Sequence, residues 1–410
     1  MQWISLNNVY FRISSFFMAP KFKSPDYQLY RQSSFQHRWL RLEHLIPELD
    51  KIKSSAFFKM ESFGQSEEKR PLHKIEFGIG PKKIMIWTQM HGNEPTATMA
   101  VVDLLHFLMN DGDTYQFLRK SIYENCTLLF IPLLNPDGAE RFSRRNATGI
   151  DMNRDILQLQ SLEMNNFIDL FKDFKPHWAF NLHDQRNFFS VGNSKCPATI
   201  SFLSASPDEQ RSISPTRLKS MQMVATLAEL VESESICHSG RYSDEYYPRA
   251  LGEFFHSQEV PCVLVESGAF PNDPFRDEAR RLNFLILIHA FENIIDEEFL
   301  EEMGTGPYFS IPENGKTILD GIIRGCVLEK NGSKVDLGLM VQEKPNFETM
   351  ELESTYILSD LGDLSFQYGL TEWEGGRISE NTELELEKPA DFEIKRKTGE
   401  SLVFKNGVLA

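Results

Sequence analysis

Short apolar runs alternate with amphipathic stretches through most of the first 300 residues. Segments in which apolar residues recur every three or four positions predict helices, whereas near-continuous apolar runs of four to eight residues predict buried strands. Because these strands lack polar alternation, they predict an α/β fold, with a mostly parallel or mixed central sheet and helices on both faces. Strands are predicted at 72–78, 82–89, 126–134, 177–182 and 261–265, and helices at 39–60, 95–110, 158–173, 216–233 and 277–300.

The pattern changes at about residue 305. From there, short strand-like runs are broken by Asn-Gly pairs and single glycines, which predicts a small all-β domain at the C-terminal end. The expected organisation is therefore a disordered extension over 1–20, a catalytic domain over 21–303 and a β-rich domain over 304–410. The extension contains Arg12 and no cleavage site, so we expect neither a signal peptide nor a membrane anchor, and Met18 is an alternative start.

Charge and cysteine content narrow the class of protein. A formal charge of −16 on 410 residues argues against nucleic-acid binding, which requires a basic surface to displace counterions from phosphates. Five widely spaced cysteines predict buried small side chains rather than a disulfide framework, and hence a reducing, cytoplasmic location. They are Cys126, Cys196, Cys237, Cys262 and Cys326. We expect no membrane partner, and the oligomeric state stays open.

Polar residues stand at the ends of four predicted strands. His91 follows the strand 82–89, Asn135 follows 126–134, His183 follows 177–182 and Glu266 follows 261–265. In open α/β sheets, ligands bind beyond the carboxyl ends of the strands, so we expect these four groups to converge on one crevice.

The two histidines of this set and a neighbouring glutamate have the composition of a metal site. His91, Glu94 and His183 would supply two imidazoles and one carboxylate, the ligands of many catalytic zinc sites that keep one position open for water. Glu266 is then the candidate general base, because a carboxylate beside that water can take its proton. The alternatives are an ordinary loop pair, in which Glu94 caps a helix before Pro95, and a Glu266 buried against an arginine.

The order of five motifs resembles the zinc metallocarboxypeptidase family, the relatives of carboxypeptidases A and B. The motifs cover roughly residues 75–300 and appear in the family's order. They are HGNE at 91–94, NPDG at 135–138, RRNATGIDMNRD at 144–155, NLHD at 181–184 and VESG at 265–268. The resemblance implies one Zn²⁺ per chain held by His91, Glu94 and His183, with Glu266 as the base.

The resemblance also implies substrate-binding residues. Arg144 matches the arginine that polarises the scissile carbonyl, with Arg145 as the alternative, and Asn153 and Arg154 match the pair that holds the terminal carboxylate. The structural alternative is a hydrogen-bond network at the sheet edge. In that reading Asp151, Asp155 and Arg141 are surface salt-bridge partners.

Two departures from the family pattern leave the substrate open. The family carries a tyrosine that closes over the substrate, and here Tyr242, Tyr246 and Tyr247 lie upstream of Glu266. Tyr246 or Tyr247 is favoured among the three, with a role as core aromatics as the open alternative. Asn93 replaces the arginine of the digestive enzymes, and the HGNE string also resembles the aspartoacylase and succinylglutamate desuccinylase branch.

The function expected from the sequence is a zinc-dependent hydrolase that cleaves an amide bond next to a free carboxylate, foremost a metallocarboxypeptidase. Its partner would be a peptide or an N-acyl amino acid with a free carboxylate. An N-acyl amino acid deacylase is the first alternative. A non-catalytic zinc-binding pseudoenzyme is the second, although such a protein would not need Glu266.

Overall fold

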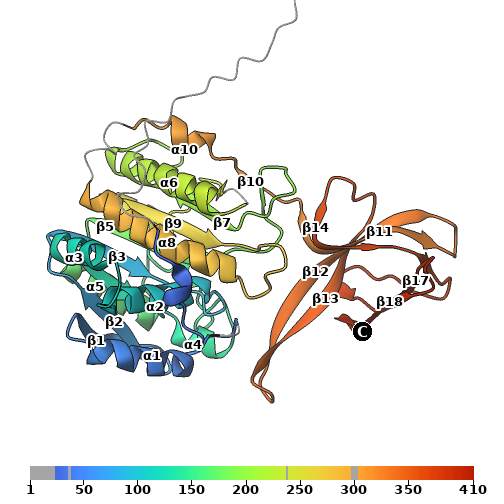
Figure 1. Cartoon of the computed structure of the whole chain (residues 1–410), viewed down its shortest axis with the longest axis horizontal. Helices are drawn as coiled ribbons and strands as arrows, with labels where there is room; N and C mark the ends of the chain where they lie inside the picture. The colour runs from blue at the N-terminus through green and yellow to red at the C-terminus, as the bar shows by residue number, and fades with distance from the viewer. Residues whose placement is uncertain (1–23, 36–37, 237–238, 297–302) are drawn as a thin grey trace, which may run out of the picture.

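The computed structural model describes residues 24–35, 38–236, 239–296 and 303–410. It has two parts, a large α/β body and a smaller β-rich body that carries the C-terminus (Figure 1). The predicted extension over 1–20, with Met18, lies outside the described residues, as do Cys237 and the end of the predicted helix after residue 296. No helix in the described ranges is long and apolar enough to cross a bilayer.

An eight-stranded mixed sheet forms the centre of the α/β body. Its order is β1-β2-β4-β3-β5-β9-β7-β8, and the four middle strands β4, β3, β5 and β9 run parallel. This confirms the predicted mixed α/β fold. The bounds are β1 Phe58–Gln65, β2 Pro71–Phe77, β3 Lys82–Trp87, β4 Cys126–Ile131, β5 Trp178–Asp184, β7 Ile200–Ser204, β8 Gly240–Arg241 and β9 Cys262–Ser267.

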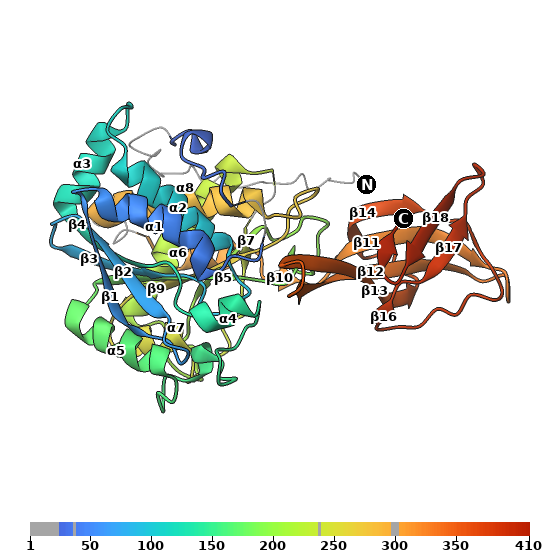
Figure 2. The same cartoon turned by 90° about the horizontal axis from the view of Figure 1, so that it is seen from below.

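Helices cover both faces of the sheet, as expected for strands that are apolar on both sides (Figure 2). Local signals set their starts: Ser161 caps α5 through Met164 N–H, and Ser214 caps α6 ahead of Pro215. The bounds are α1 Leu42–Ser54, α2 Thr96–Met109, α3 Gln116–Asn125, α4 Pro136–Glu140, α5 Leu162–Phe174, α6 Pro215–Glu234, α7 Leu251–Ser257 and α8 Asp277–Ile295.

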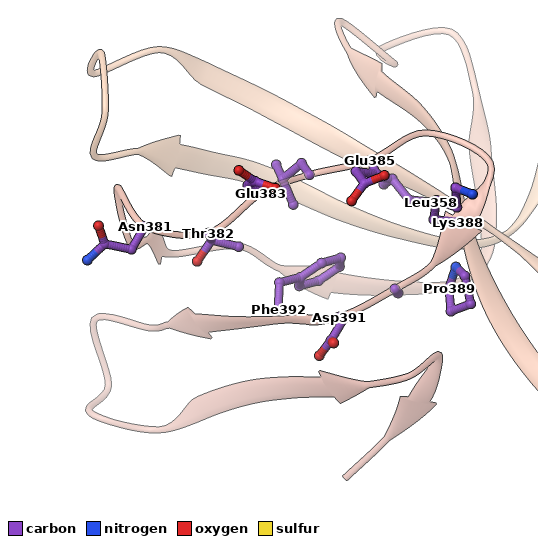
Figure 3. A pocket seen from close by; sticks show the side chains of 11 residues that line it. Leu358, Asn381, Thr382, Glu383, Glu385, Lys388, Pro389, Asp391 and Phe392 are labelled. Carbon is purple, nitrogen blue, oxygen red and sulfur yellow. The ribbon is translucent and has the colours of Figure 1, made fainter.

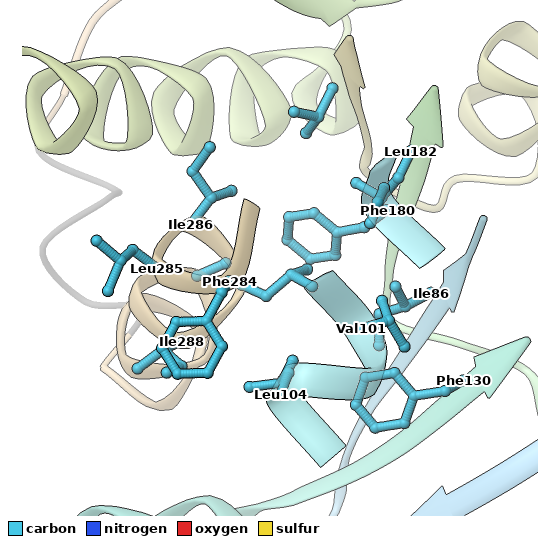
Figure 4. Close-up of a cluster of buried hydrophobic side chains, with 14 of the residues drawn as sticks. Ile86, Val101, Leu104, Phe130, Phe180, Leu182, Phe284, Leu285, Ile286 and Ile288 are labelled. Carbon is cyan, nitrogen blue, oxygen red and sulfur yellow. The ribbon is translucent and has the colours of Figure 1, made fainter. Parts of the chain in front are cut away.

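Alternation along the strands divides the core between the two faces. Ile86 and Phe180 pack with Phe284 of α8 on one face (Figure 4), whereas Trp87 on the other face stacks on Phe255 of α7 at 4.9 Å. This packing on both faces of the sheet holds the carboxyl ends of β3, β5 and β9 in place.

The N-terminal prediction of one helix over 39–60 was too long. Helix α1 ends at Ser54, and β1 begins at Phe58 as an antiparallel edge strand on β2. Most β1 side chains are partly or fully exposed, so the polar residues of this strand continue the helix-like pattern. Pairing with β2 makes this segment a strand and not a continuation of the helix, and the local pattern of apolar residues does not show that pairing.

The C-terminal part is all-β, as predicted. Its sheet runs β16-β13-β12-β11-β15-β17-β18-β19, and β14 pairs in parallel with another stretch of β11 outside this order. A pocket of about 490 Å³ opens within this part between β13 and residues 381–392 (Figure 3). The bounds are β11 Ile318–Leu328, β12 Lys334–Asn346, β13 Glu351–Gly362, β14 Tyr368–Glu374, β15 Arg377–Ile378, β16 Lys388–Pro389, β17 Phe392–Lys395, β18 Ser401–Lys405 and β19 Val408–Leu409.

The two parts meet later in the chain than residue 304. Helix α10, Gly306–Ser310, packs on α6, and Tyr308 is buried in the core of the α/β body. Residues up to about 311 therefore belong with the first part by packing. The connection then pairs as β10 (Asn314–Gly315) with β6 (Ser190–Val191), which ties it to the loop after β5.

Candidate metal centre

The strand ends bring His91, Glu94, His183 and Glu266 together. His91 and Glu94 lie in the turn between β3 and α2. His183 and Glu266 are the next-to-last residues of strands β5 and β9. Strands β5 and β9 are parallel neighbours, and His183 is the register partner of Glu266. Of the four strand-end groups predicted to converge, His91, His183 and Glu266 therefore do so, and Glu94 joins them.

Glycines allow the two motif loops to approach each other at this edge. A Cβ on Gly92 would lie 2.0 Å from the backbone carbon of Gly138, far inside van der Waals contact. The HGNE turn therefore packs backbone against backbone on the NPDG turn, and only glycine permits this distance.

Three atoms able to bind a metal ion lie close together. His91 Nδ1 lies 2.9 Å from Glu94 Oε2, His183 Nδ1 lies 2.8 Å from the same oxygen, and the two Nδ1 atoms are 3.1 Å apart. All three residues are buried. Two imidazole nitrogens and one carboxylate oxygen fit Zn²⁺ in number and kind, so these residues are able to hold the ion that the sequence predicts.

The electrostatics of the cluster reflect burial opposed by close charges. Burial favours the neutral form of His91, but Glu94 and Asp151 outweigh it and raise the pKa of this imidazole. Burial lowers the pKa of His183 despite the adjacent Glu94. The two imidazoles in turn overcome the burial of Glu94 and lower the pKa of its carboxyl. Glu94 is thus held as a carboxylate, the form that binds metal.

Glu266 faces the cluster with one carboxylate oxygen unpartnered. Its Oε2 is fully enclosed and has no hydrogen-bond partner in the described part of the chain. Burial, followed by the carboxylates of Glu94 and Asp184, raises the pKa of Glu266 well above its usual value. No ion pair of Glu266 with an arginine is present among the described residues, and the charges of Arg144 and Arg276 only partly offset the rise in the pKa of this carboxyl. A carboxyl in this state is able to hold and release a proton.

Arg144 reaches the cluster, whereas Arg145 does not. Arg144 Nη1 lies 3.1 Å from His91 Nδ1 and 3.3 Å from Glu94 Oε1. Arg145 turns away and donates to the carbonyl of Gly149. The alternative assignment of the oxyanion arginine to Arg145 therefore has no geometric support. Since Arg144 contacts the nitrogen that an ion would take, this contact and ion binding exclude each other.

Asp151 is a site residue that the sequence analysis did not identify. It accepts from His91 Nε2 at 3.2 Å and from Arg144 Nε at 3.0 Å, and it is mostly buried. The alternative reading, in which Asp151 is a surface salt-bridge partner, does not describe it, because its mostly buried carboxylate joins Arg144 to the imidazole of a metal-ligand histidine. The signal for Asp151 that the sequence offered was its position two residues before Asn153.

Asp155 and Asn135 have structural roles. Asp155 is buried and accepts the N–H groups of Gln160 and Ser161, so it is not a surface salt-bridge partner either. Asn135 caps α4 through Gly138 N–H and donates to the carbonyl of Met90. Of the four strand-end groups, Asn135 thus organises the loops and does not face the cluster. Arg141 forms the predicted surface ion pair, with Glu68.

Asn153 and Arg154 follow Asp151 in a short 3₁₀ turn. Asn153 is buried and its Oδ1 accepts from Leu251 N–H at 3.0 Å, which leaves its amide NH₂ to donate elsewhere. The Arg154 guanidinium lies 5.3 Å from the ring centre of Tyr247, and its Nη1 donates to the carbonyl of Asn153. Both side chains present donors next to the loop that fixes His91.

The tyrosines divide between two places. Tyr247 is about half exposed and donates to Glu245 while it covers Arg154. Tyr242 packs on Phe189 at 5.1 Å, and burial together with the charges of Glu266 and Glu94 raises the pKa of its hydroxyl. Tyr246 has no ring contact with the cluster residues. Tyr242, which was not favoured, is therefore the tyrosine whose surroundings include Glu266.

An open α/β sheet with a His-Glu-His cluster at its carboxyl edge and a facing glutamate defines a class of protein with a hydrolase-type metal centre. Residues 47–206 match the zinc carboxypeptidase family. The resemblance inferred from the motifs is thereby confirmed.

Relatives in sequence are carboxypeptidases of fungi and plants. Carboxypeptidase 2 of Trichophyton rubrum is 34% identical over 118 residues, which are 28% of this chain and 20% of that protein. Carboxypeptidase SOL1 of Arabidopsis thaliana is 31% identical over 109 residues, or 25% of this chain and 22% of that protein. The chain thus spans about a fifth of the length of these relatives.

Solved structures share the fold. A metallo-carboxypeptidase from Burkholderia cenocepacia has a TM-score of 0.53 at 17% identity, covering 64% of this chain and 71% of its own. A metallo-carboxypeptidase from Pseudomonas aeruginosa, solved in complex with (2-guanidinoethylmercapto)succinic acid, has a TM-score of 0.51 at 15% identity, with coverage of 64% and 71%. Both likenesses concern the fold alone.

Proposed function

We propose that this protein is a zinc-dependent metallocarboxypeptidase that removes the last residue of a peptide with a free C-terminus. The observation that carries the proposal is the convergence of His91 Nδ1, Glu94 Oε2 and His183 Nδ1 within 3.1 Å of one another, in register with Glu266. The match of residues 47–206 to the zinc carboxypeptidase family supports the same activity.

Glu266 acts as the proton carrier in this proposal. When bound, Zn²⁺ supplies Lewis acidity and brings the pKa of its water to about 7. Glu266 takes the proton of the attacking water and passes it to the leaving amine, so it alternates between base and acid. Its enclosed, unpartnered Oε2 and its raised pKa suit both steps.

Arg144 and the Asn153–Arg154 pair hold the substrate. Arg144 is partly exposed beside the cluster, where its guanidinium is able to stabilise the oxygen of the scissile carbonyl. The Asn153 amide and the Arg154 guanidinium bind the terminal carboxylate through charge-assisted hydrogen bonds, with Tyr247 covering Arg154. This arrangement selects substrates by their free carboxylate.

An N-acyl amino acid deacylase is the second candidate function. Asn93 between the ligands favours it, as does the β-rich part, which contacts the α/β body beside the loop after β5. Both activities need the same carboxylate contacts and differ in how much chain lies on the other side of the bond. A pseudoenzyme is disfavoured, because the ligands, Glu266 and Arg144 all occupy one site.

The test is mass spectrometry of defined substrates with zinc-loaded and chelator-treated protein. We expect zinc-dependent loss of one residue from N-blocked free-acid peptides and no cleavage of the same peptides with an amidated C-terminus. Hydrolysis of N-acyl amino acids without cleavage of any peptide would favour the deacylase. Efficient cleavage of amidated peptides would contradict the role of Asn153 and Arg154.

A further inference from the structure

A cleft of about 710 Å³ lies between the α/β body and the β-rich part. Its floor is the segment after β9, including Ala269, Phe275 and Arg276, and its other wall is the hairpin of β12 and β13, which extends beside the first part in Figure 1. Cavities of this size hold ligands larger than a single amino acid. The cleft therefore has room for several residues of an extended chain.

The cleft lies next to the metal centre, although none of the four cluster residues lines it. Arg276 lines it and donates to the carbonyl of Ser267 at 2.6 Å, directly after Glu266, and to the carbonyl of Gln185 at 2.8 Å, two residues after His183. Because an extended chain covers roughly 3.4 Å per residue, a substrate held at the cluster would need only a few further residues to reach the cleft.

The hairpin presents one face to the cleft. Val341 is the register partner of Tyr356, and Glu343 is the partner of Ser354, so these side chains stand on the same face, and all four line the cleft. The two parts are held together here by an ion pair of Arg38 with Glu343 at 2.8 Å. The β-rich part is thus a wall of the cleft and not a remote appendage.

Charge and exposure indicate what the cleft binds. Its lining has four carboxylates against two guanidinium groups. Arg38 pairs with the cleft residue Glu343 and also lies near Asp184, and Arg276 lies 3.5 Å from Asp184, so neither guanidinium is paired with the other three carboxylates. Phe275 is 50% and Met350 is 42% exposed, so apolar surface is open beside the negative charges. The carboxylates are Asp273, Asp320, Glu343 and Glu351.

An open backbone edge adds a further feature. Pairing of β12 with β11 ends at Leu339, and within the described ranges no strand pairs with residues 342–346 on the side opposite β13. On that side the N–H of Val341 donates to Asp320. An exposed strand edge is able to accept an extended peptide through main-chain hydrogen bonds.

We infer that the interdomain cleft binds the polypeptide segment that precedes the scissile bond, and that it prefers segments with lysine or arginine side chains among apolar ones. This inference rests on the proposed carboxypeptidase function and assigns its substrate class. The cleft carboxylates attract the cationic side chains, Phe275 and Met350 contact the apolar ones, and a long substrate gains contacts that a dipeptide lacks.

The test compares an N-blocked dipeptide with two N-blocked octapeptides that share its last two residues and carry either lysine or glutamate at the preceding positions. For the wild-type chain, we expect kcat/KM to be at least about tenfold higher for the lysine octapeptide than for the dipeptide, since one or two partly screened charge contacts and apolar burial amount to about that factor. The glutamate octapeptide should gain little.

Two variants assign the effect to the cleft. Ser354→Arg adds a positive charge and bulk inside the cleft, so the ratio of lysine-octapeptide to dipeptide kcat/KM should fall about fivefold. The matched control is Glu353→Arg, a larger charge change on the neighbouring, exposed position that faces the other way and does not line the cleft. It should leave the ratio unchanged.

Binding measurements separate this inference from the proposed function. Fluorescence anisotropy of a dye-labelled lysine octapeptide on full-length, zinc-loaded Glu266→Gln protein should show binding that Ser354→Arg weakens and Glu353→Arg does not. Equal kcat/KM for all three substrates, or equal effects of both variants, would overturn the cleft assignment while peptide cleavage still supports the carboxypeptidase. Absence of all cleavage together with variant-sensitive binding would refute the activity and leave the cleft as a binding site.

Discussion

Replacing Asp151 by asparagine tests how the loop that carries Asn153 supports the metal centre. Asp151 accepts from His91 Nε2 at 3.2 Å and from Arg144 Nε at 3.0 Å, and its side chain is only 12% exposed. Asparagine keeps the shape, but it removes the charge and turns one acceptor into a donor. One of the two contacts is then lost, and His91 becomes a less basic and less well-oriented ligand.

Partners of metal-bound histidines typically contribute 10–100-fold to metal affinity. We therefore expect the zinc dissociation constant of Asp151→Asn to rise about 10–100-fold, or ~1.4–2.7 kcal/mol. The assay is competition of the protein with a chromophoric chelator. Asp169→Asn on the exposed face of α5 is the control, because Asp169 pairs with Lys172 at the surface, and the zinc affinity of this variant should equal that of the wild type. An unchanged dissociation constant in Asp151→Asn would refute the orienting role.

Three further predictions concern the base, the carboxylate contact and stability. Glu266→Gln should keep zinc, measured by metal analysis, while kcat falls at least ~100-fold; parallel loss of zinc would mean that Glu266 is a ligand. Arg154→Ala should raise KM for free-acid peptides more than it lowers kcat in steady-state assays, whereas an unchanged KM would remove Arg154 from substrate binding. His256 is buried between Ser220 and the Ala205 carbonyl, and burial lowers its pKa from 6.5 to about 4. Its neutral form is required in the fold, so up to ~3 kcal/mol of unfolding free energy should be present above pH 6.5 and lost as the pH falls toward 4, with a shallower loss in His256→Gln by denaturant unfolding; equal pH slopes would contradict this.

Much of the α/β body was predictable because its strands are buried on both faces. Such strands consist of continuous apolar residues, so a polar residue at their end, such as His183 or Glu266, stands out in the sequence. Which strands lie next to each other in the sheet was not predictable from the pattern. The register that places His183 opposite Glu266 depends on the order of strands in the sheet, which arises from pairing between segments about 80 residues apart.

Most of the residues whose roles were not predicted lie in loops. Asp151 acts on His91 across 60 positions, and a local pattern cannot distinguish it from a surface carboxylate. Asn135 precedes Pro-Asp-Gly, which is a turn signal, and its buried capping role follows from that chemistry rather than from reactivity. Tyr242 lies in an irregular segment after β8, where no periodicity indicates which side chain turns inward. Strand β1 was missed because an exposed edge strand contains too few apolar residues to interrupt the helical pattern.

The central claim is that a single ion held by His91, Glu94 and His183 drives hydrolysis at the C-terminus of a peptide. Its most direct measurement is a titration of chelator-stripped protein with zinc, followed by the release of the last residue from an N-blocked free-acid peptide. The account predicts no release without metal, a linear rise to a plateau at about one zinc per chain, and no recovery in His183→Ala. Full activity in the stripped protein, or the same titration curve in His183→Ala, would contradict it.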